Sequence, residues 1–218
     1  MSVTAEEALS ATHYVDSDHP DVRDWAADVV RGQATPRDRA VALFYAVRDG
    51  VRYDPYVSSP DPGDYRASVI VGQDRNWCVP KSILLTAGAR AAGVPSLLGF
   101  ADVRNHLASE KLLAQVGTDL FAFHGYSLFL LDGRWVKATS AFNIEMCTRF
   151  GVKPIEFDGV NDSFYHEFDV EGRHHMEYVR HRGEFVEFPW EEMCRVFEEV
   201  YGSRPGIDPG THDAMFHS

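Results

Sequence analysis

The sequence predicts an α+β fold in which a helical N-terminal part packs on an antiparallel sheet. Three observations support this class. Apolar residues recur at helical spacing in three segments before residue 93 of the 218-residue chain. Strand-forming runs follow, and two of them flank Asp132-Gly133, a strong signal for a two-residue hairpin turn. The segment 189–202 then has helical spacing again.

The first two expected helices have clear start signals. In "DHPDVRDWAADVVRG" (18–32), Pro20 suits the first turn and Gly32 lies past the end. In "TPRDRAVALFYAVRDG" (35–50), Thr35 is an expected N-cap in front of a stripe of apolar residues. A short extended piece and a loop rich in Pro, Gly and Asp follow.

The third expected helix begins near Cys78, in the stretch "RNWCVPKSILL". Asn76 is the expected N-cap, Pro80 fits the first turn, and Gly93 ends the helix. A thiol at a helix N-terminus has a lowered pKa and is a nucleophile. The competing interpretation is a small residue that simply packs.

Strands are expected from residue 96 onward, interrupted by a polar, helix-like insertion at 108–119. In the hairpin, a two-residue turn pairs Leu131 with Arg134. Counting outward, Tyr126 opposes Thr139, His124 opposes Ala141, and these four side chains share one face. Thr139 is then diagonal to His124, roughly 7–8 Å away between backbones.

Four stretches carry a resemblance to a known family: "AVALFYAVRDGVRYDP", "NWCVPKSILLTAGARAAGVPSLLGF", "HGYSLFLLDGRWVKATSAFN" and "FGVKPIEFDG". They resemble the transglutaminase-like superfamily, the bacterial branch of the papain-like thiol enzymes. The resemblance implies a papain-like, transglutaminase-core fold, with the helix from Cys78 packed on the antiparallel sheet. It implies one domain over 1–218, with a core at about 35–159 and extensions at 1–34 and 160–218.

The resemblance also implies a Cys-His-Asp triad. Cys78 matches the nucleophile, whose thiolate the helix N-terminus and a nearby imidazolium would favour. His124 matches the base that takes the thiol proton and returns a proton to the leaving amine. The backbone N–H of Cys78 is a candidate oxyanion donor. Trp77 either adds an indole donor or walls the groove.

The third triad position departs from the family, which has an aspartate a short spacer after a tryptophan. Counting from Trp135 places Thr139 there, whereas matching threonine to threonine places Lys137 there. The hairpin count favours Thr139. Its hydroxyl can accept from the imidazole Nδ1–H but supplies no full charge to an imidazolium. Asn143 is the alternative third position, because papain-type enzymes use an asparagine.

These residues predict a thiol-dependent acyl-transfer enzyme that hydrolyses an amide or peptide bond through a thioester on Cys78. One alternative is a catalytically weak or inactive module that binds peptides or proteins. An amine-accepting transglutaminase is a second alternative. A structural domain with a buried Cys78 is a third.

Composition narrows the partners and cofactors. A net charge of -12 and a pI of about 5.2 argue against nucleic acid and anionic membranes. Cys78, Cys147 and Cys194 form no CxxC pair, and the histidines of "RHHMEYVRH" have no metal-ligand spacing. We therefore expect no metal and no cofactor. The expected substrate is a peptide, a protein or another amide. Cys147 and Cys194 are expected to be core residues. No signal peptide or membrane span is visible, which predicts a cytoplasmic protein.

Overall fold

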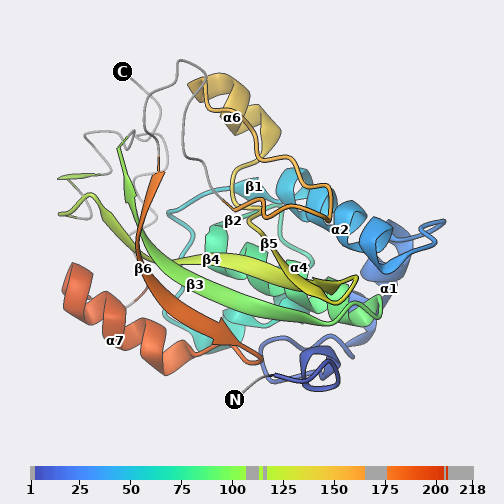
Figure 1. Cartoon of the computed structure of the whole chain (residues 1–218). Helices are drawn as coiled ribbons and strands as arrows, with labels where there is room; N and C mark the ends of the chain where they lie inside the picture. Colours follow the sequence, from blue (N-terminus) through green and yellow to red (C-terminus); the bar gives the residue numbers. More distant parts are fainter. Residues whose placement is uncertain (1–2, 107–112, 115–116, 165–175, 204, 206–218) are drawn as a thin grey trace.

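The computed structural model describes residues 3–106, 113–114, 117–164, 176–203 and 205 (Figure 1). Helices and a four-stranded antiparallel sheet make up this part of the chain, so the α+β prediction is confirmed. The helices are η1 (Glu7–Leu9), α1 (Pro20–Val29), α2 (Pro36–Gly50), η2 (Pro62–Tyr65), α3 (Ala67–Ile70), α4 (Cys78–Ala91), α6 (Ile144–Phe150) and α7 (Trp190–Tyr201), where η marks a 3-10 turn. The strands are β1 (Arg52–Tyr53), β2 (Arg75–Asn76), β3 (Ser96–Asn105), β4 (Leu120–Leu131), β5 (Arg134–Ala138) and β6 (Met176–Phe185).

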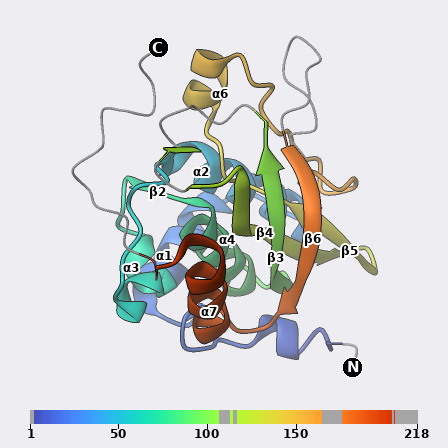
Figure 2. The same cartoon turned by 90° about the vertical axis from the view of Figure 1, so that its left-hand side faces the viewer.

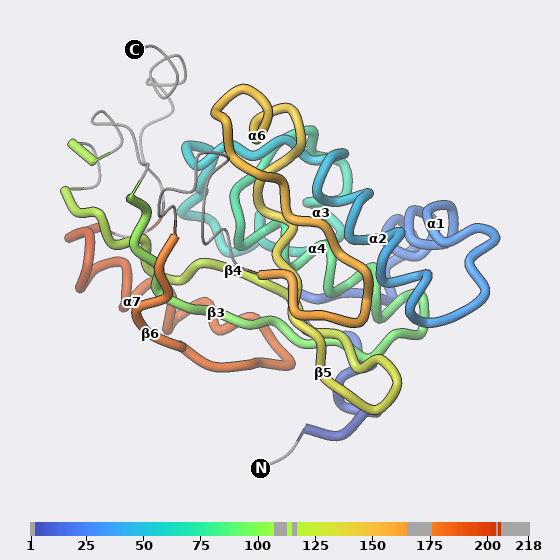
Figure 3. Tube along the Cα trace, turned by 45° about the horizontal axis from the view of Figure 1, so that its top comes forward, coloured from blue at the N-terminus to red at the C-terminus, as the bar shows by residue number. Residues whose placement is uncertain are grey.

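The sheet has the strand order β5-β4-β3-β6, and a separate parallel pair joins β1 to β2. Helix α4 packs on β4 and β3, and α1, α2 and α3 pack on α4 (Figure 1). Helix α7 lies at the far end of the sheet, next to β4 (Figure 2). Helix α6 lies beside α2 (Figure 3). None of the described helices is long and apolar enough to cross a bilayer.

The predicted starts of α1 and α2 are confirmed. Thr35 and Asp38 form a reciprocal cap in which Thr35 Oγ1 accepts from the Asp38 N–H at 3.1 Å. The Asp38 carboxylate accepts from the Thr35 N–H at 3.2 Å. Helix α1 is capped by His19, whose Nδ1 accepts from the Asp21 N–H at 3.3 Å.

Helix α4 is buried on every side, because it lies between the sheet and the N-terminal helices. Every residue from Cys78 to Arg90 is buried, so the helix lacks the solvated face that a surface helix shows. The expected N-cap at Asn76 is off by one residue. Trp77 is the N-cap, and Asn76 belongs to β2, where its side-chain oxygen accepts from the Trp77 N–H at 2.9 Å.

The predicted hairpin register is confirmed from Leu131–Arg134 to Ser127–Ala138. The ladder ends there, so the expected pairs of Tyr126 with Thr139 and His124 with Ala141 do not form. The reason is a competing partner, because the Thr139 N–H donates to the Ser163 carbonyl at 3.0 Å. The chain after β5 therefore leaves β4 and follows the segment around residue 163.

The sequence was less informative elsewhere. The predicted insertion at 108–119 lies mostly outside the described residues. The region after residue 160, expected as loops with short extended pieces, contains the ten-residue edge strand β6. The last predicted helix is confirmed as α7. Cys147 and Cys194 are buried in the core, as expected.

Candidate active site

Cys78 is the first residue of α4 and lies where this helix meets β4. Its side chain is buried, and the backbone N–H groups of Gly125, Val79 and Cys78 itself act to lower the pKa of its thiol. A Cβ atom added to Gly125 would lie 3.0 Å from the Cys78 carbonyl oxygen and 3.1 Å from Val79 Cα. The start of α4 and strand β4 therefore touch at the residue directly after His124.

His124 is buried on β4, and its described hydrogen-bond partner is Thr139. The Thr139 hydroxyl donates to the Gly125 carbonyl at 3.2 Å and lies 3.5 Å from His124 Nε2. Because the hydroxyl proton is used by Gly125, its oxygen acts as acceptor toward the ring. This arrangement favours the tautomer with the proton on Nε2 and leaves Nδ1 as the basic nitrogen. The sequence prediction had the opposite nitrogen facing Thr139.

The resting site holds a neutral thiol and a neutral imidazole. Burial raises the pKa of Cys78 to about 11, against a smaller lowering by the neighbouring backbone N–H groups. Burial also lowers the pKa of His124 to about 4. The expected lowering of the Cys78 pKa is therefore wrong, because desolvation outweighs the helix N-terminus. Among the described residues, no hydrogen bond joins the Cys78 thiol to His124.

The two other candidates for the third position lie away from the ring. Asn143 is the N-cap of α6, and its side-chain oxygen accepts from the Tyr53 N–H at 3.0 Å. Lys137 lies with its Nζ over the Tyr126 ring, 5.7 Å from the centroid, and pairs with Glu184 at 3.4 Å. Of the three, Thr139 is the residue that the structure places against His124.

Trp77 packs between η2 and α7, with its ring centroid 6.3 Å from that of Tyr65 and 5.9 Å from that of Phe197. Its indole nitrogen is buried and has no acceptor among the described residues. The Tyr65 hydroxyl is near the Trp77 indole N–H, but the two groups do not meet the geometry of a hydrogen bond. Trp77 and Pro80 border an open cavity of about 430 Å³ next to the start of α4.

Lys81 is a buried cation one helical turn after Cys78, and the sequence analysis did not single it out. Its ammonium group donates to the carbonyls of Arg48, at 3.0 Å, and Val51, at the C-terminal end of α2. Burial lowers the pKa of Lys81 to about 7. The sequence signal for Lys81 is a single lysine three residues after Cys78, within the mostly apolar stretch that forms α4. A lysine in such a stretch is buried only when its charge has partners.

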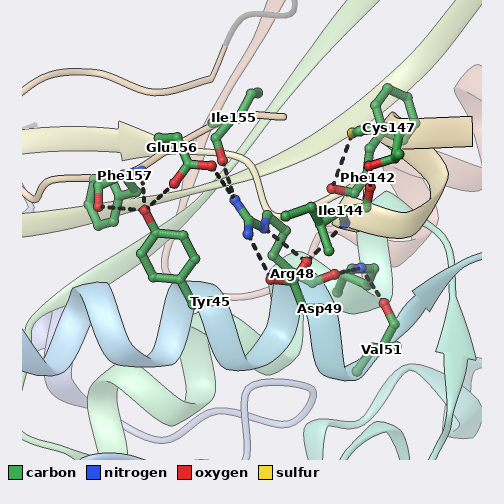
Figure 4. A network of polar contacts seen from close by, with 12 residues as sticks. Tyr45, Arg48, Asp49, Val51, Phe142, Ile144, Cys147, Ile155, Glu156 and Phe157 are labelled. Carbon is green, nitrogen blue, oxygen red and sulfur yellow. Dashed lines mark hydrogen bonds and ion pairs between the residues drawn. The ribbon is translucent and has the colours of Figure 1, made fainter. Parts of the chain in front are cut away.

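Arg48, whose carbonyl accepts from Lys81, belongs to a polar network that ties α2 to α6 (Figure 4). The Arg48 guanidinium donates to the Ile155 carbonyl at 2.8 Å and pairs with Asp49 at 2.7 Å. Asp49 in turn accepts from the Ile144 N–H at 2.9 Å. These contacts fix the first turn of α6 and with it the position of Asn143. Within the described part of the chain, no group of three or more His, Cys, Asp or Glu side chains could hold a metal ion.

Two solved structures are similar to this chain at low identity. One, from Cytophaga hutchinsonii and described as a "putative cysteine protease", is 15% identical, with a TM-score of 0.49 over 64% of this chain and 43% of that chain. The other, a "putative protease" from Parabacteroides distasonis, is 12% identical, with a TM-score of 0.38 over 65% of this chain and 29% of that chain. The chain thus spans less than half the length of either protein. No curated protein matches it.

The family model of the transglutaminase-like superfamily matches residues 23–140. The matched segment contains α4 with Cys78, strand β4 with His124, and Thr139 after β5. It ends before Asn143 and before β6 and α7. Because the match covers more than half of the chain, this protein belongs to the transglutaminase-like superfamily.

Proposed function

We propose that this chain is a thiol-dependent acyl-transfer enzyme that hydrolyses an amide or peptide bond through a thioester on Cys78. One observation carries the proposal: the start of α4 touches strand β4 at Gly125, the residue directly after His124, where an added Cβ would lie 3.0 Å from the Cys78 carbonyl oxygen. A helix-start cysteine and a strand histidine thus lie on two elements in contact, and the Thr139 hydroxyl lies 3.5 Å from the His124 ring nitrogen Nε2.

In the reaction, His124 Nδ1 takes up a proton and releases it twice, once in each half. First, Nδ1 takes the thiol proton while Sγ bonds to the substrate carbonyl carbon. The C–N bond then breaks, and the imidazolium gives its proton to the leaving amine. Water adds to the thioester carbon and gives a proton to Nδ1. The C–S bond breaks, the carboxylic acid leaves, and Sγ recovers its proton.

The oxyanion of the tetrahedral intermediate needs donors near Cys78. The backbone N–H of Cys78 is one, because the first amides of a helix have no intrahelical acceptor. The Trp77 indole packs against Tyr65 and Phe197, so we assign Trp77 to the wall of the groove and not to the oxyanion.

The free site does not hold a preformed thiolate–imidazolium pair. Thr139 orients the ring, but it supplies no negative charge to stabilise an imidazolium. In related triads, loss of the charged member lowers turnover by about four orders of magnitude. We therefore expect slow turnover, with proton transfer driven by nucleophilic attack.

Acylation by p-nitrophenyl acetate tests this proposal. We expect release of p-nitrophenolate together with one acetyl group on Cys78, identified by peptide mass spectrometry. Cys78→Ala abolishes both, and His124→Ala slows both, whereas the matched Cys147→Ala variant keeps them. Acetylation of Cys78 that is unaffected by His124→Ala would refute the catalytic pair.

The burial of both groups favours one second candidate, a peptide-binding module without turnover. Its supporting observation is the combination of a raised Cys78 pKa, a lowered His124 pKa and an uncharged third position. In that case wild type releases p-nitrophenolate no faster than Cys78→Ala. If acylation does occur, adding a primary amine separates hydrolysis from amine transfer, because only transfer places the amine in the product.

A further inference from the structure

Strand β4 carries one extra residue immediately before His124. On one side of it Phe121 pairs with Val103, and on the other His124 pairs with Ala101. Ala122 and Phe123 therefore face the single residue Asp102 of β3, which is a β-bulge. Phe123 has φ 62°, in the left-handed region that bulky residues seldom adopt.

The bulge decides where the His124 side chain points. Side chains alternate along a strand, so one residue more or less moves every later side chain to the opposite face. With the extra residue, His124 lies opposite Ala101 and Gly125 lies against the start of α4. Without it, the two residues would exchange faces relative to Phe121.

Side chains from other elements satisfy the backbone groups that the bulge removes from the ladder. The Phe123 N–H donates to the Asp102 carboxylate at 3.1 Å. The Ala122 N–H donates to the Tyr201 hydroxyl of α7 at 2.6 Å, and that hydroxyl donates to the Leu120 carbonyl at 3.3 Å. The backbone N–H groups of both bulge residues, Ala122 and Phe123, thus have partners outside the usual strand pairing.

Arg182 of β6 holds Asp102 in place. Its Nε donates to the two carboxylate oxygens at 2.9 and 3.0 Å, and its Nη2 donates at 2.6 Å. The side chains of Asp102 and Arg182 are only 3% and 8% exposed. A buried bidentate pair of this kind fixes geometry as well as charge. Asp102 touches neither the Cys78 thiol nor the His124 ring among the described contacts.

We propose that Asp102, held by Arg182, is a positioning residue that keeps the β4 bulge in the form that places His124 opposite Ala101, with its ring against Thr139. The inference rests on the proposed function and extends it beyond the segment that the family model matches, because β6 and α7 lie after residue 140. It assigns those two elements a part in arranging the site.

The test replaces the ion pair by apolar residues of similar size. Asp102→Leu with Arg182→Met leaves no unpaired buried charge. The matched control is Asp16→Leu with Arg66→Met, because Asp16 is also buried, accepts from a backbone N–H (Ser68, 3.0 Å) and pairs with an arginine at 2.9 Å. The rate of Cys78 acetylation by p-nitrophenyl acetate is measured for each, with His124 present and in the His124→Ala background.

We expect the Asp102/Arg182 pair variant to slow acetylation at least about ten-fold when His124 is present, because small displacements of reacting groups are costly. In the His124→Ala background it should change nothing, since a positioning effect disappears with the group positioned. The Asp16/Arg66 control leaves the rate unchanged. An equal loss in both backgrounds, or no loss where wild type depends on His124, overturns the inference.

Two further measurements keep the proposal independent of folding and of activity. If the pair variant does not fold, Tyr201→Phe removes only the hydroxyl bonded to the bulge and should act in the same direction. The nitrogen NMR shifts of His124 report its tautomer without any substrate. We expect an Nε2–H ring in wild type and a mixture in the variants. If wild type is not acetylated at Cys78 but the variants do change the His124 tautomer, only the proposed function is refuted. If the tautomer is the same in wild type and variants, the positioning role is refuted.

Discussion

Gly125→Ala tests the contact between the start of α4 and strand β4. The added Cβ would lie 2.7 Å from Ser82 Oγ, 3.0 Å from the Cys78 carbonyl oxygen and 3.1 Å from Val79 Cα. Ser82 Oγ is itself held by a hydrogen bond to the Val79 carbonyl at 2.7 Å. Two of the three neighbours are backbone atoms of a buried helix, so relief requires α4 and β4 to move apart.

Overpacking a buried site costs about 1–3 kcal/mol of unfolding free energy. For a chain of this size, that corresponds to a melting temperature lowered by about 4–8 °C, taking the middle of the range. The same displacement separates Cys78 from His124, because Gly125 directly follows the histidine. We therefore expect acetylation of Cys78 to slow by about ten-fold or more.

Thermal unfolding and the acetylation rate are measured on Gly125→Ala and on a matched control, Gly50→Ala. Gly50 is the last residue of α2 and has no neighbour within 4 Å of an added Cβ. Alanine there should stabilise the helix by about 0.5–1 kcal/mol and leave acetylation unchanged. If Gly125→Ala melts within about 1 °C of wild type and reacts at the same rate, the close approach of α4 to β4 is wrong.

Three further outcomes follow from the site. Thr139→Asp places a carboxylate near His124 Nε2 and should raise the histidine pKa by about 1 to 3, seen as a shifted pH profile of acetylation; an unshifted profile excludes position 139. Because the folded pKa of His124, about 4, lies below its ordinary 6.5, wild type binds fewer protons when folded and gains stability as pH rises through this window. In urea titrations between pH 4 and pH 6.5, the unfolding free energy of wild type should rise by about 3 kcal/mol more than that of His124→Gln. Equal changes in the two proteins would contradict the effect of burial on the His124 pKa. Lys81→Met leaves the Arg48 and Val51 carbonyls without their donor and should cost about 1–3 kcal/mol in the same titrations, whereas unchanged stability would contradict the α2 cap.

The local parts of this fold were predictable, because they depend on residues close in sequence. The Thr35–Asp38 cap, the Asp132-Gly133 turn and the hairpin register out to Ala138 each use interactions within a few residues. The start of α4 was predicted to within one residue, and the error came from Asn76, which caps by bonding the next amide from within β2. The resemblance to the superfamily suggested Cys78 and His124 as a catalytic pair, and counting from Trp135 along the hairpin singled out Thr139.

By itself, the sequence determined the fold class, the family and the order of the elements that carry Cys78, His124 and Thr139. Only the tertiary structure decided the electrostatics and the aim of these groups. The sign of the Cys78 pKa change depends on how many elements cover α4, and the nitrogen facing Thr139 depends on what the threonine hydroxyl already bonds. The bulge before His124 is held by Asp102, Arg182 and Tyr201, and Asp102 and Arg182 alone are 80 positions apart. Burial and long-range hydrogen bonds arise from the packing of distant segments, and no local pattern in the sequence records them.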